Sequence, residues 1–226
     1  MAHVDMHLST AERSSLDRVS IDRDLPQFDA YGVVGDELKQ QLTGHLSGMG
    51  ENDPTDVERI AETIHRLAVG MQNGFGKEAA WITVRVSVPN PAFDVPRWHP
   101  DGAYYATAEN EKTYKLVAAL KGAQTLFGKV RDGEVYQQLE NAEHENQRKN
   151  ENDSETFEAE KLRIRYELVK IIEPMNPPAS EQATVYRVGD KQAVIHSEPP
   201  IAEPRIFVSV LPGSREQIEE WQSRPE

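Results

Sequence analysis

The chain has 226 residues, enough for one domain with a sizeable core, and 38% of them are apolar, which excludes a wholly disordered chain. It contains no cysteine, so disulfides, thiolate nucleophiles and Cys-held metals are excluded, and any metal must be held by His, Asp and Glu. No apolar run is long enough to span a membrane, and the first residues lack the basic and apolar regions of a secretory signal. We therefore expect a cytoplasmic protein.

The net charge of −13 is unevenly distributed along the chain. Residues 134–160 hold nine acids against Arg148 and Lys149, so this segment alone carries −7. Binding to a phosphate backbone needs clustered Lys and Arg, and the sequence has no such cluster. We expect neither a nucleic-acid nor a membrane partner.

The first third of the chain is predicted to be helical, over residues 9–76. After eight residues expected to form a loose end, Ser9 and Glu12 have the spacing of a capping box. Apolar residues recur at helical spacing over 38–49, and a longer helix is expected to start at Asp53 and continue past Met71.

The period of the apolar pattern changes from helical to two at Trp81. Residues 81–88 alternate with β-branched side chains on one face, as expected for a strand. Short strands separated by Gly and Pro turns favour an antiparallel barrel or jelly roll. A capping box at Ser214 and Gln217 predicts a final helix. Further strands are predicted at 114–120, 124–127, 183–188, 192–196 and 205–211.

An acidic insertion at about 132–175 interrupts the strands. Its polar part at 137–160 suits either a solvated helix or mobile loop, or a lid over a site. That segment is too polar to be expected to supply core. The alternation of Leu162, Ile164, Tyr166 and Leu168 predicts that the insertion returns as a strand.

Two histidines stand out because of their neighbours in the sequence. His99 and Asp101 are two positions apart, so on an extended backbone both point to one face and can grip one divalent ion. His196 closes a short strand where an apolar residue is the ordinary expectation. Nine residues later Arg205 opens the next strand, and its guanidinium matches a carboxylate ligand.

Together these residues resemble the Fe(II)/2-oxoglutarate-dependent dioxygenases over residues 81–128 and 183–212. The resemblance implies a double-stranded β-helix (jelly roll) core with flanking helices, in a single domain spanning 1–226. It implies that His99, Asp101 and His196 hold Fe(II), and that Arg205 binds the cosubstrate 2-oxoglutarate, with dioxygen as the oxidant.

Details of the motifs bear on the branch of this family. The segment Gly122–Phe127 is similar to a glycine-rich segment of the taurine-dioxygenase and prolyl-hydroxylase branches, which makes Thr125 a candidate cosubstrate contact or an ordinary strand residue. Phe207 stands where the plant-type pattern has Ser, and Leu211 where nucleic-acid dealkylases have a second Arg. The motifs do not decide whether the chain resembles the taurine-dioxygenase branch or the prolyl-hydroxylase branch more closely.

Aromatic and cationic residues near the metal motif are candidates for a substrate pocket. The alternatives are packing at the barrel mouth for the aromatic rings and surface solvation for the arginines. The candidates are Trp98, Tyr104, Tyr105, Arg85 and Arg97.

The function that this resemblance favours is oxidation, as hydroxylation, of a small organic substrate. Within the same class, the alternative is a protein side-chain (prolyl-type) hydroxylase. From another class, the alternative is a non-catalytic jelly-roll module that binds a metal or ligand. The sequence leaves the substrate and the oligomeric state open.

Overall fold

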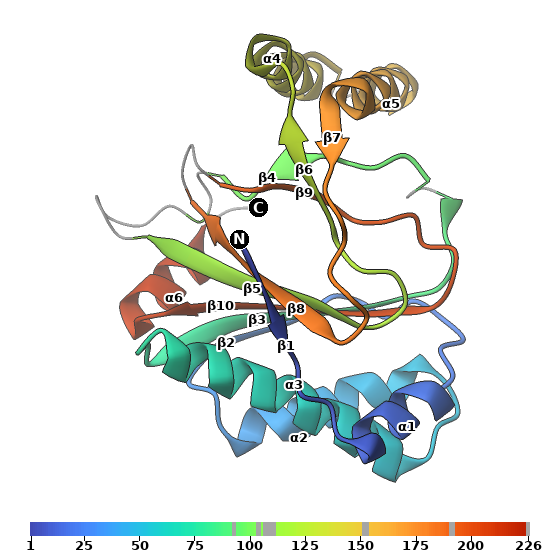
Figure 1. Ribbon diagram of the computed structural model, residues 1–226, viewed down its shortest axis with the longest axis vertical. Helices are drawn as coiled ribbons and strands as arrows, with labels where there is room; N and C mark the ends of the chain where they lie inside the picture. The colour runs from blue at the N-terminus through green and yellow to red at the C-terminus, as the bar shows by residue number, and fades with distance from the viewer. Residues whose placement is uncertain (92–93, 103–104, 106–111, 151–153, 190–192, 225–226) are drawn as a thin grey trace.

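The computed structural model describes the chain except for residues 92–93, 103–104, 106–111, 151–153, 190–192 and 225–226. Two antiparallel sheets form its centre, with helices on two sides (Figure 1). The larger sheet has the strand order β1-β8-β5-β10-β3-β2, and the smaller has the order β4-β9-β6-β7. Over the described residues, the predicted class of antiparallel sheets with flanking helices is confirmed.

Outside the acidic insertion, the strands predicted from Trp81 onward are found, with shifts of a few residues at their ends. The strands are β1 (Ala2–Asp5), β2 (Phe28–Gly32), β3 (Ala79–Ser87), β4 (His99–Pro100), β5 (Thr113–Lys121), β6 (Leu126–Val130), β7 (Ile172–Pro174), β8 (Gln182–Val188), β9 (Ile195–Ser197) and β10 (Arg205–Gly213). The helices are α1 (Thr10–Arg18), α2 (Asp36–Leu46), α3 (Pro54–Gly74), α4 (Gly133–Asn150), α5 (Ser154–Ile171) and α6 (Arg215–Ser223), with a 3-10 turn at Ser47–Met49.

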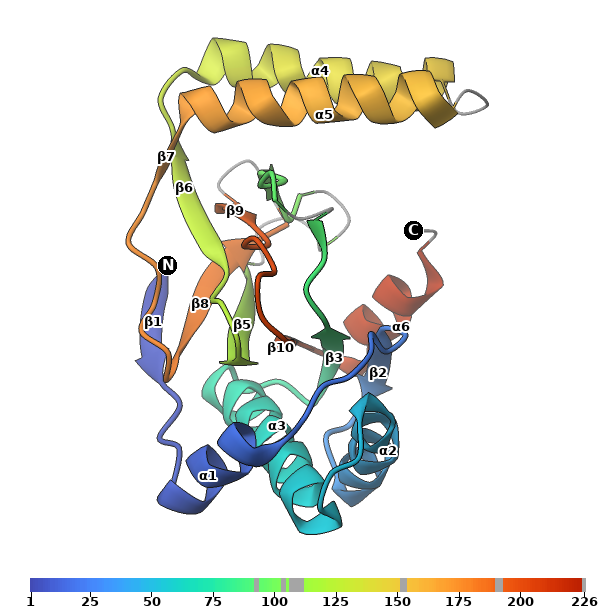
Figure 2. The ribbon, with the colours of Figure 1, turned by 90° about the vertical axis from the view of Figure 1, so that its right-hand side faces the viewer.

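The larger sheet has one apolar face, which packs on α1, α2 and α3 (Figure 2). Strand side chains alternate between the two faces of a sheet, so β3, β5 and β10 each offer every second residue to these helices. The other residues of the same strands point to the opposite face, toward the smaller sheet. Those packed on the helices include Ile82, Val84, Val86, Leu116, Ala118, Ile206, Val208 and Val210.

Capping predicted from the sequence is found at both ends of the chain. The Ser9 hydroxyl accepts a hydrogen bond from the Glu12 amide, and the Glu12 carboxylate accepts one from the Ser9 amide. Ser214 and Gln217 make the same reciprocal pair at the start of α6. The two capping-box predictions are confirmed.

Two predictions of local structure are wrong. Within the first eight residues, Ala2–Asp5 is not a loose end, because it pairs with β8 as an edge strand. Residues 162–168 form part of helix α5 and not a strand. Ile164 and Leu168 are four apart and buried together, whereas Leu162 and Tyr166 are exposed on another side of the helix, so the alternation in sequence is a helical pattern.

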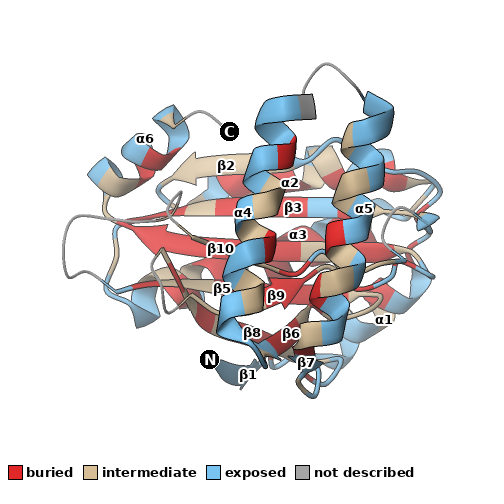
Figure 3. Ribbon diagram, turned by 90° about the horizontal axis from the view of Figure 1, so that it is seen from above, coloured by how far each residue is buried: buried red, intermediate tan, exposed pale blue. Residues whose placement is uncertain are grey.

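The acidic insertion is a pair of helices. Helices α4 and α5 lie side by side above the sheets, connected to them through β6 and β7 (Figure 2), and most of their surface is exposed (Figure 3). The insertion nevertheless supplies core, contrary to expectation. Leu139, Ile164 and Leu168 are buried against Trp98 and Ile172, because helix formation gathers the few apolar residues on one side.

None of the helices among the described residues is long and apolar enough to cross a membrane.

The carboxylate of Glu12 ties α1 to α3, and its stabilisation is expected to depend on pH. It accepts hydrogen bonds from Thr63 at 2.8 Å and Arg66 at 2.6 Å, and its side chain is only 12% exposed. Burial raises the pKa of Glu12, but these bonds and those from Ser9 outweigh it and lower the pKa from 4.5 to about 2. A depressed folded-state pKa gives stability that is present above pH 4.5 and is lost as pH falls toward 2.

We therefore predict that Glu12→Gln lowers the free energy of unfolding at pH 7 by about 1–3 kcal/mol. The difference from the unchanged protein should shrink between pH 4.5 and 2, as followed by urea unfolding across this range. Glu58→Gln, an exposed site on α3, is the matched control. A pH-independent difference would contradict the assignment.

Candidate metal centre

His99 and His196 lie directly opposite each other on the paired strands β4 and β9. Their ring centroids are 4.5 Å apart. The Nδ1 atom of His99 is 2.7 Å from the Arg97 carbonyl, and that of His196 is 3.1 Å from the Val194 carbonyl. Since a carbonyl only accepts, each Nδ1 carries the proton, and each Nε2 has a lone pair for a ligand, with the Tyr186 hydroxyl 3.3 Å from that of His196.

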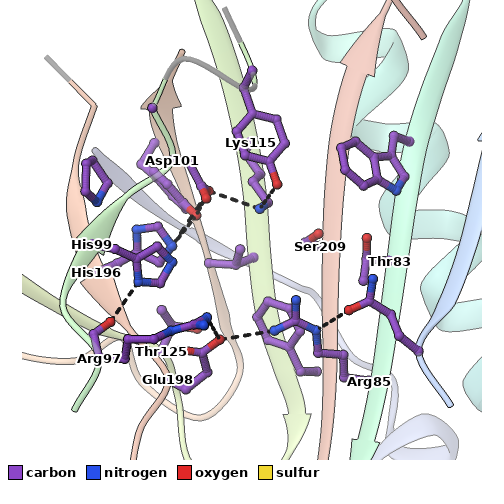
Figure 4. Close-up of a pocket in the computed structure, with 18 of the residues that line it drawn as sticks. Thr83, Arg85, Arg97, His99, Asp101, Lys115, Thr125, His196, Glu198 and Ser209 are labelled. Carbon is purple, nitrogen blue, oxygen red and sulfur yellow. Dashed lines mark hydrogen bonds and ion pairs between the residues drawn. The ribbon is translucent and has the colours of Figure 1, made fainter. Parts of the chain in front are cut away.

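Asp101 completes a cluster with the two histidines. One ligand atom from each of the three residues lies within 4.8 Å of the others. Asp101 directly follows β4, two residues beyond His99, and its Oδ2 is 3.6 Å from His196 Nε2. Figure 4 shows the two imidazoles next to each other with Asp101 beside them. The structure thus brings together the three residues predicted to hold a metal.

Two residues that sequence reasoning missed support this carboxylate. Lys115 on β5 donates to Asp101 Oδ2 at 3.0 Å, and the Tyr186 hydroxyl on β8 donates to the same atom at 2.8 Å. Burial alone would favour the protonated acid, but Lys115 and the neighbouring imidazoles hold the pKa of Asp101 well below its usual range. The acid is therefore ionised inside the protein.

These residues fit a divalent metal ion. Two imidazoles and a carboxylate form the donor set that leaves further positions open on an octahedral ion. Burial lowers the pKa of His196 to about 4 although Asp101 opposes this, so its ring is neutral at pH 7, as a ligand must be. Among the described residues the donors to Asp101 both bind Oδ2, which leaves Oδ1 for an ion.

A cavity of about 350 Å³ extends from this cluster between the two sheets. Arg205 and Thr125 line it, and the Thr125 hydroxyl oxygen is 3.5 Å from Nη2 of Arg205. Arg205 is 4% exposed and donates from Nε to the Ala123 carbonyl at 2.8 Å. Burial lowers its pKa to about 10, which still leaves the guanidinium charged at pH 7.

The turn before β6 holds Arg205 in place, and its glycine is required there. Gly122 has a φ of +82°, and a Cβ atom at this position would lie 2.7 Å from the Pro204 carbonyl oxygen and 3.1 Å from Arg205 Cα. The backbone of the turn can therefore approach the start of β10 only with glycine at 122. This contact joins the glycine-rich segment and the arginine that the sequence singled out separately.

Glu198 joins two arginines that also line the cavity (Figure 4). Its Oε1 accepts from Arg85 at 3.1 Å and from Arg97 at 3.2 Å. Burial raises the pKa of Glu198, but the charges around it, that of Arg97 foremost, outweigh burial and lower the pKa to about 2. Arg85, a predicted pocket residue, lines the cavity together with Arg97.

The predicted aromatic pocket residues have different positions. Tyr105 lines the cavity and Lys115 Nζ lies 4.8 Å from its ring centroid. Tyr104 lies outside the described residues. The prediction for Trp98 is corrected: it is 4% exposed and packs with the α4–α5 apolar cluster, because neighbours in a strand face opposite ways and His99 takes the cavity side.

The missed cavity residues share a signal in the sequence. Along the strands that carry them, every second residue is apolar and packs on the helices. The missed residues occupy the positions in between, whose side chains point to the opposite face of the sheet, the face that lines the cavity. A polar residue at such a position is therefore a site candidate even without a motif. The missed residues at such positions are Thr83 on β3, Lys115 on β5, Tyr186 on β8 and Ser209 on β10, whereas Gln27 and Glu198 lie outside these strands.

Comparisons with known proteins yield structural neighbours only. No protein-family model matches the chain, and no curated protein is significantly similar to it. The chain is similar to a prolyl-4-hydroxylase from Pseudomonas putida, with 12% identity, 94% of this chain and 91% of that chain covered, and a TM-score of 0.37. It is also similar to the rice dioxygenase for auxin oxidation, with 11% identity, coverages of 92% and 71%, and a TM-score of 0.42.

A third similar structure is a Trichoplax adhaerens prolyl hydroxylase in complex with a hypoxia inducible factor peptide fragment, with 7% identity, coverages of 99% and 87%, and a TM-score of 0.38. Two of these neighbours are named as prolyl hydroxylases and one as a dioxygenase.

We predict that the positive charge of Lys115, although it keeps Asp101 ionised, also weakens the binding of a metal ion at this carboxylate. Its ammonium is 3.0 Å from Asp101 Oδ2, so an ion held by the same carboxylate would lie near a like charge, and like charges repel strongly in a buried site. Lys115→Met should therefore tighten Mn(II) binding by about tenfold, measured by isothermal titration calorimetry, while lowering the thermal stability of the metal-free protein. Lys129→Met, an exposed site on β6, is the matched control.

Loss of a residue that only supports a metal ligand weakens metal binding by about 10–100-fold. His99→Ala removes a ligand itself, so it should weaken Mn(II) binding by more than that. If Lys115→Met weakened Mn(II) binding, the support that Lys115 gives to the ionised carboxylate would outweigh its repulsion of the ion, and the prediction would be wrong.

Proposed function

We propose that this protein is an Fe(II)- and 2-oxoglutarate-dependent oxygenase, with residues 1–226 forming one catalytic domain around a jelly-roll core. The observation that carries the proposal is the convergence of His99, Asp101 and His196 on a cavity that also contains the buried cation Arg205. The reaction is the hydroxylation of a small organic substrate, in which substrate, dioxygen and 2-oxoglutarate give hydroxylated product, succinate and carbon dioxide.

When bound, the ferrous ion supplies the oxidising chemistry that transfers one oxygen atom of dioxygen to the substrate and the other to succinate. The chain's own contribution is to hold the ion on one side only, through His99, Asp101 and His196, so that cosubstrate and dioxygen have room. Lys115 and Tyr186 keep the aspartate ionised and oriented through Oδ2.

Arg205 is suited to bind the distal carboxylate of 2-oxoglutarate. Among the described residues no carboxylate lies within ion-pair distance of its guanidinium, although the side chain is 4% exposed. A charge buried without a partner is costly, and a carboxylate in the cavity would compensate it with a planar pair of hydrogen bonds. Thr125, beside Nη2, is placed to contact the same carboxylate.

The size and lining of the cavity favour a small-molecule substrate. Its volume of about 350 Å³ lies within the range of small-ligand sites, about 300–1,000 Å³. Aromatic side chains Trp81, Tyr105 and Phe207 form part of its wall and supply apolar contact area.

The proposal is tested by incubating the iron-loaded full chain with 2-oxoglutarate and pools of small metabolites under air. We expect iron-dependent formation of succinate and, by mass spectrometry, a metabolite that gains one oxygen. Asp101→Ala should lose both activities. Succinate that forms only with a peptide pool would favour the protein hydroxylase, and a protein that binds iron but never forms succinate would be the non-catalytic module.

A separate prediction concerns Arg205 as the cosubstrate anchor. Arg205→Ala should weaken 2-oxoglutarate binding by about 30- to 1,000-fold, the cost of losing a bidentate charged contact. Arg205→Lys should recover only part of this, because an ammonium lacks the planar fork. The measurement is the cosubstrate Michaelis constant for succinate formation, with Arg163→Lys, exposed on α5, as control. An unchanged constant in Arg205→Ala would remove Arg205 from the site.

A further inference from the structure

A second cavity lies next to the first, between helix α5 and the strands that carry the candidate metal centre. It has a volume of about 460 Å³. Arg85, Arg97 and Glu198 line both cavities, so these three side chains form the boundary between them. We call the second cavity the α5 groove. Its remaining described lining residues are Val95, Glu158, Lys161 and Arg165.

Helix α5 turns one of its faces to this groove. Glu158, Lys161 and Arg165 are three and seven positions apart, and therefore lie along one side of the helix. Arg163, two positions before Arg165, is exposed and paired with Glu160 on the same helix. The cations of α5 are thus divided between the groove and the solvent.

The α5 groove is positively charged in a strongly acidic protein. Its lining holds four cationic side chains against two carboxylates, a net charge of +2, whereas the whole chain carries −13. One carboxylate, Glu198, is shared by Arg85 and Arg97, so one of those two positive charges is not balanced. Lys161 is paired with Glu158 at 3.1 Å.

Arg165 is the cation whose partner is missing. Its Nε atom is buried and has no hydrogen-bond partner among the described residues. A buried donor without an acceptor costs free energy, so an acceptor beside Arg165 Nε would be stabilising. Oε2 of Glu198, at the boundary, is also buried without a partner among the described residues, so the acceptor belongs on the Arg165 side of the groove. An anion placed between Arg165 and the Arg85–Arg97 pair would supply that acceptor and balance the excess charge.

We propose that the α5 groove binds the anionic group, a carboxylate or a phosphate, of a small acidic substrate. The carbon to be oxidised then lies across the boundary in the first cavity, near the metal centre. The acidic insertion is thereby a wall of the substrate site. The assignment of the bound anion as a substrate rests on the proposed function, whereas the binding of an anion in the groove does not.

Binding can be measured without turnover, on the full chain with no iron added. The probes are hexanoate, hexyl phosphate and the uncharged hexanol, titrated by ligand-observed NMR. We expect at least one of the two acids to bind and hexanol to bind much more weakly. The tighter of the two acids identifies the groove as a carboxylate or a phosphate site.

Variants on one helix provide matched comparisons. Arg165→Gln should weaken binding of the acid by at least about tenfold, the cost of one charge-assisted hydrogen bond. Arg163→Gln, with the same change of charge outside the groove, should alter it by less than about twofold. Lys161→Gln gives a second test if Arg165→Gln unfolds the helices, which circular dichroism would reveal.

Several outcomes would overturn the proposal. These are failure of both acids to bind, equal binding to Arg165→Gln and Arg163→Gln, and displacement of the acids by 2-oxoglutarate, which would make the groove part of the cosubstrate site. Arg165-dependent binding of an acidic peptide, with no binding of the small acids, would overturn it in favour of a peptide substrate. Arg165-dependent binding in a protein that never forms succinate would overturn the proposed function and leave the anion site standing.

Discussion

The alternation of side chains across the larger sheet is the constraint on which both the fold and the cavity depend. One face of β3, β5 and β10 must be apolar because it is buried against α1, α2 and α3. The opposite face is then free to hold Thr83, Lys115 and Ser209 at the cavity. Since a slip of one residue in register would exchange the two faces, packing on the helices also fixes which polar groups meet the metal centre.

The main electrostatic cost of this arrangement is the burial of the ionised Asp101 carboxylate. A buried carboxylate is tolerated only with compensation, which here comes from Lys115, Tyr186 and two imidazoles on four different strands. The direct pairing of His99 with His196 places both rings beside the acid, and β5 and β8 bring the other two groups from the facing sheet. The cluster is therefore a contact between the two sheets. It keeps Asp101 ionised even when no metal ion is bound.

Sequence reasoning succeeded where a local pattern has one structural meaning. The strand alternation from Trp81, the capping boxes and the close approach of residues predicted to bind metal all follow from short-range rules. It missed Lys115 and Tyr186 because their importance comes from strand pairing, which brings residues 14 and 85 positions from Asp101 to the same oxygen. It also misplaced Trp98, where nearness in sequence to His99 was mistaken for nearness to the cavity.

The acidic insertion shows why the net charge of a segment does not predict the charge of the surface that it presents to a neighbour. The whole insertion at 132–175 holds twelve acids against six cations, a net charge of −6, yet a helix sorts its side chains by angle, so the charge facing a neighbour is not the charge of the segment. On α5, Ile164 and Leu168 face the core beside Trp98, while Lys161 and Arg165 face the α5 groove. A segment that is acidic overall can therefore complete a cationic site, provided that it is helical and held at a fixed angle by its buried residues.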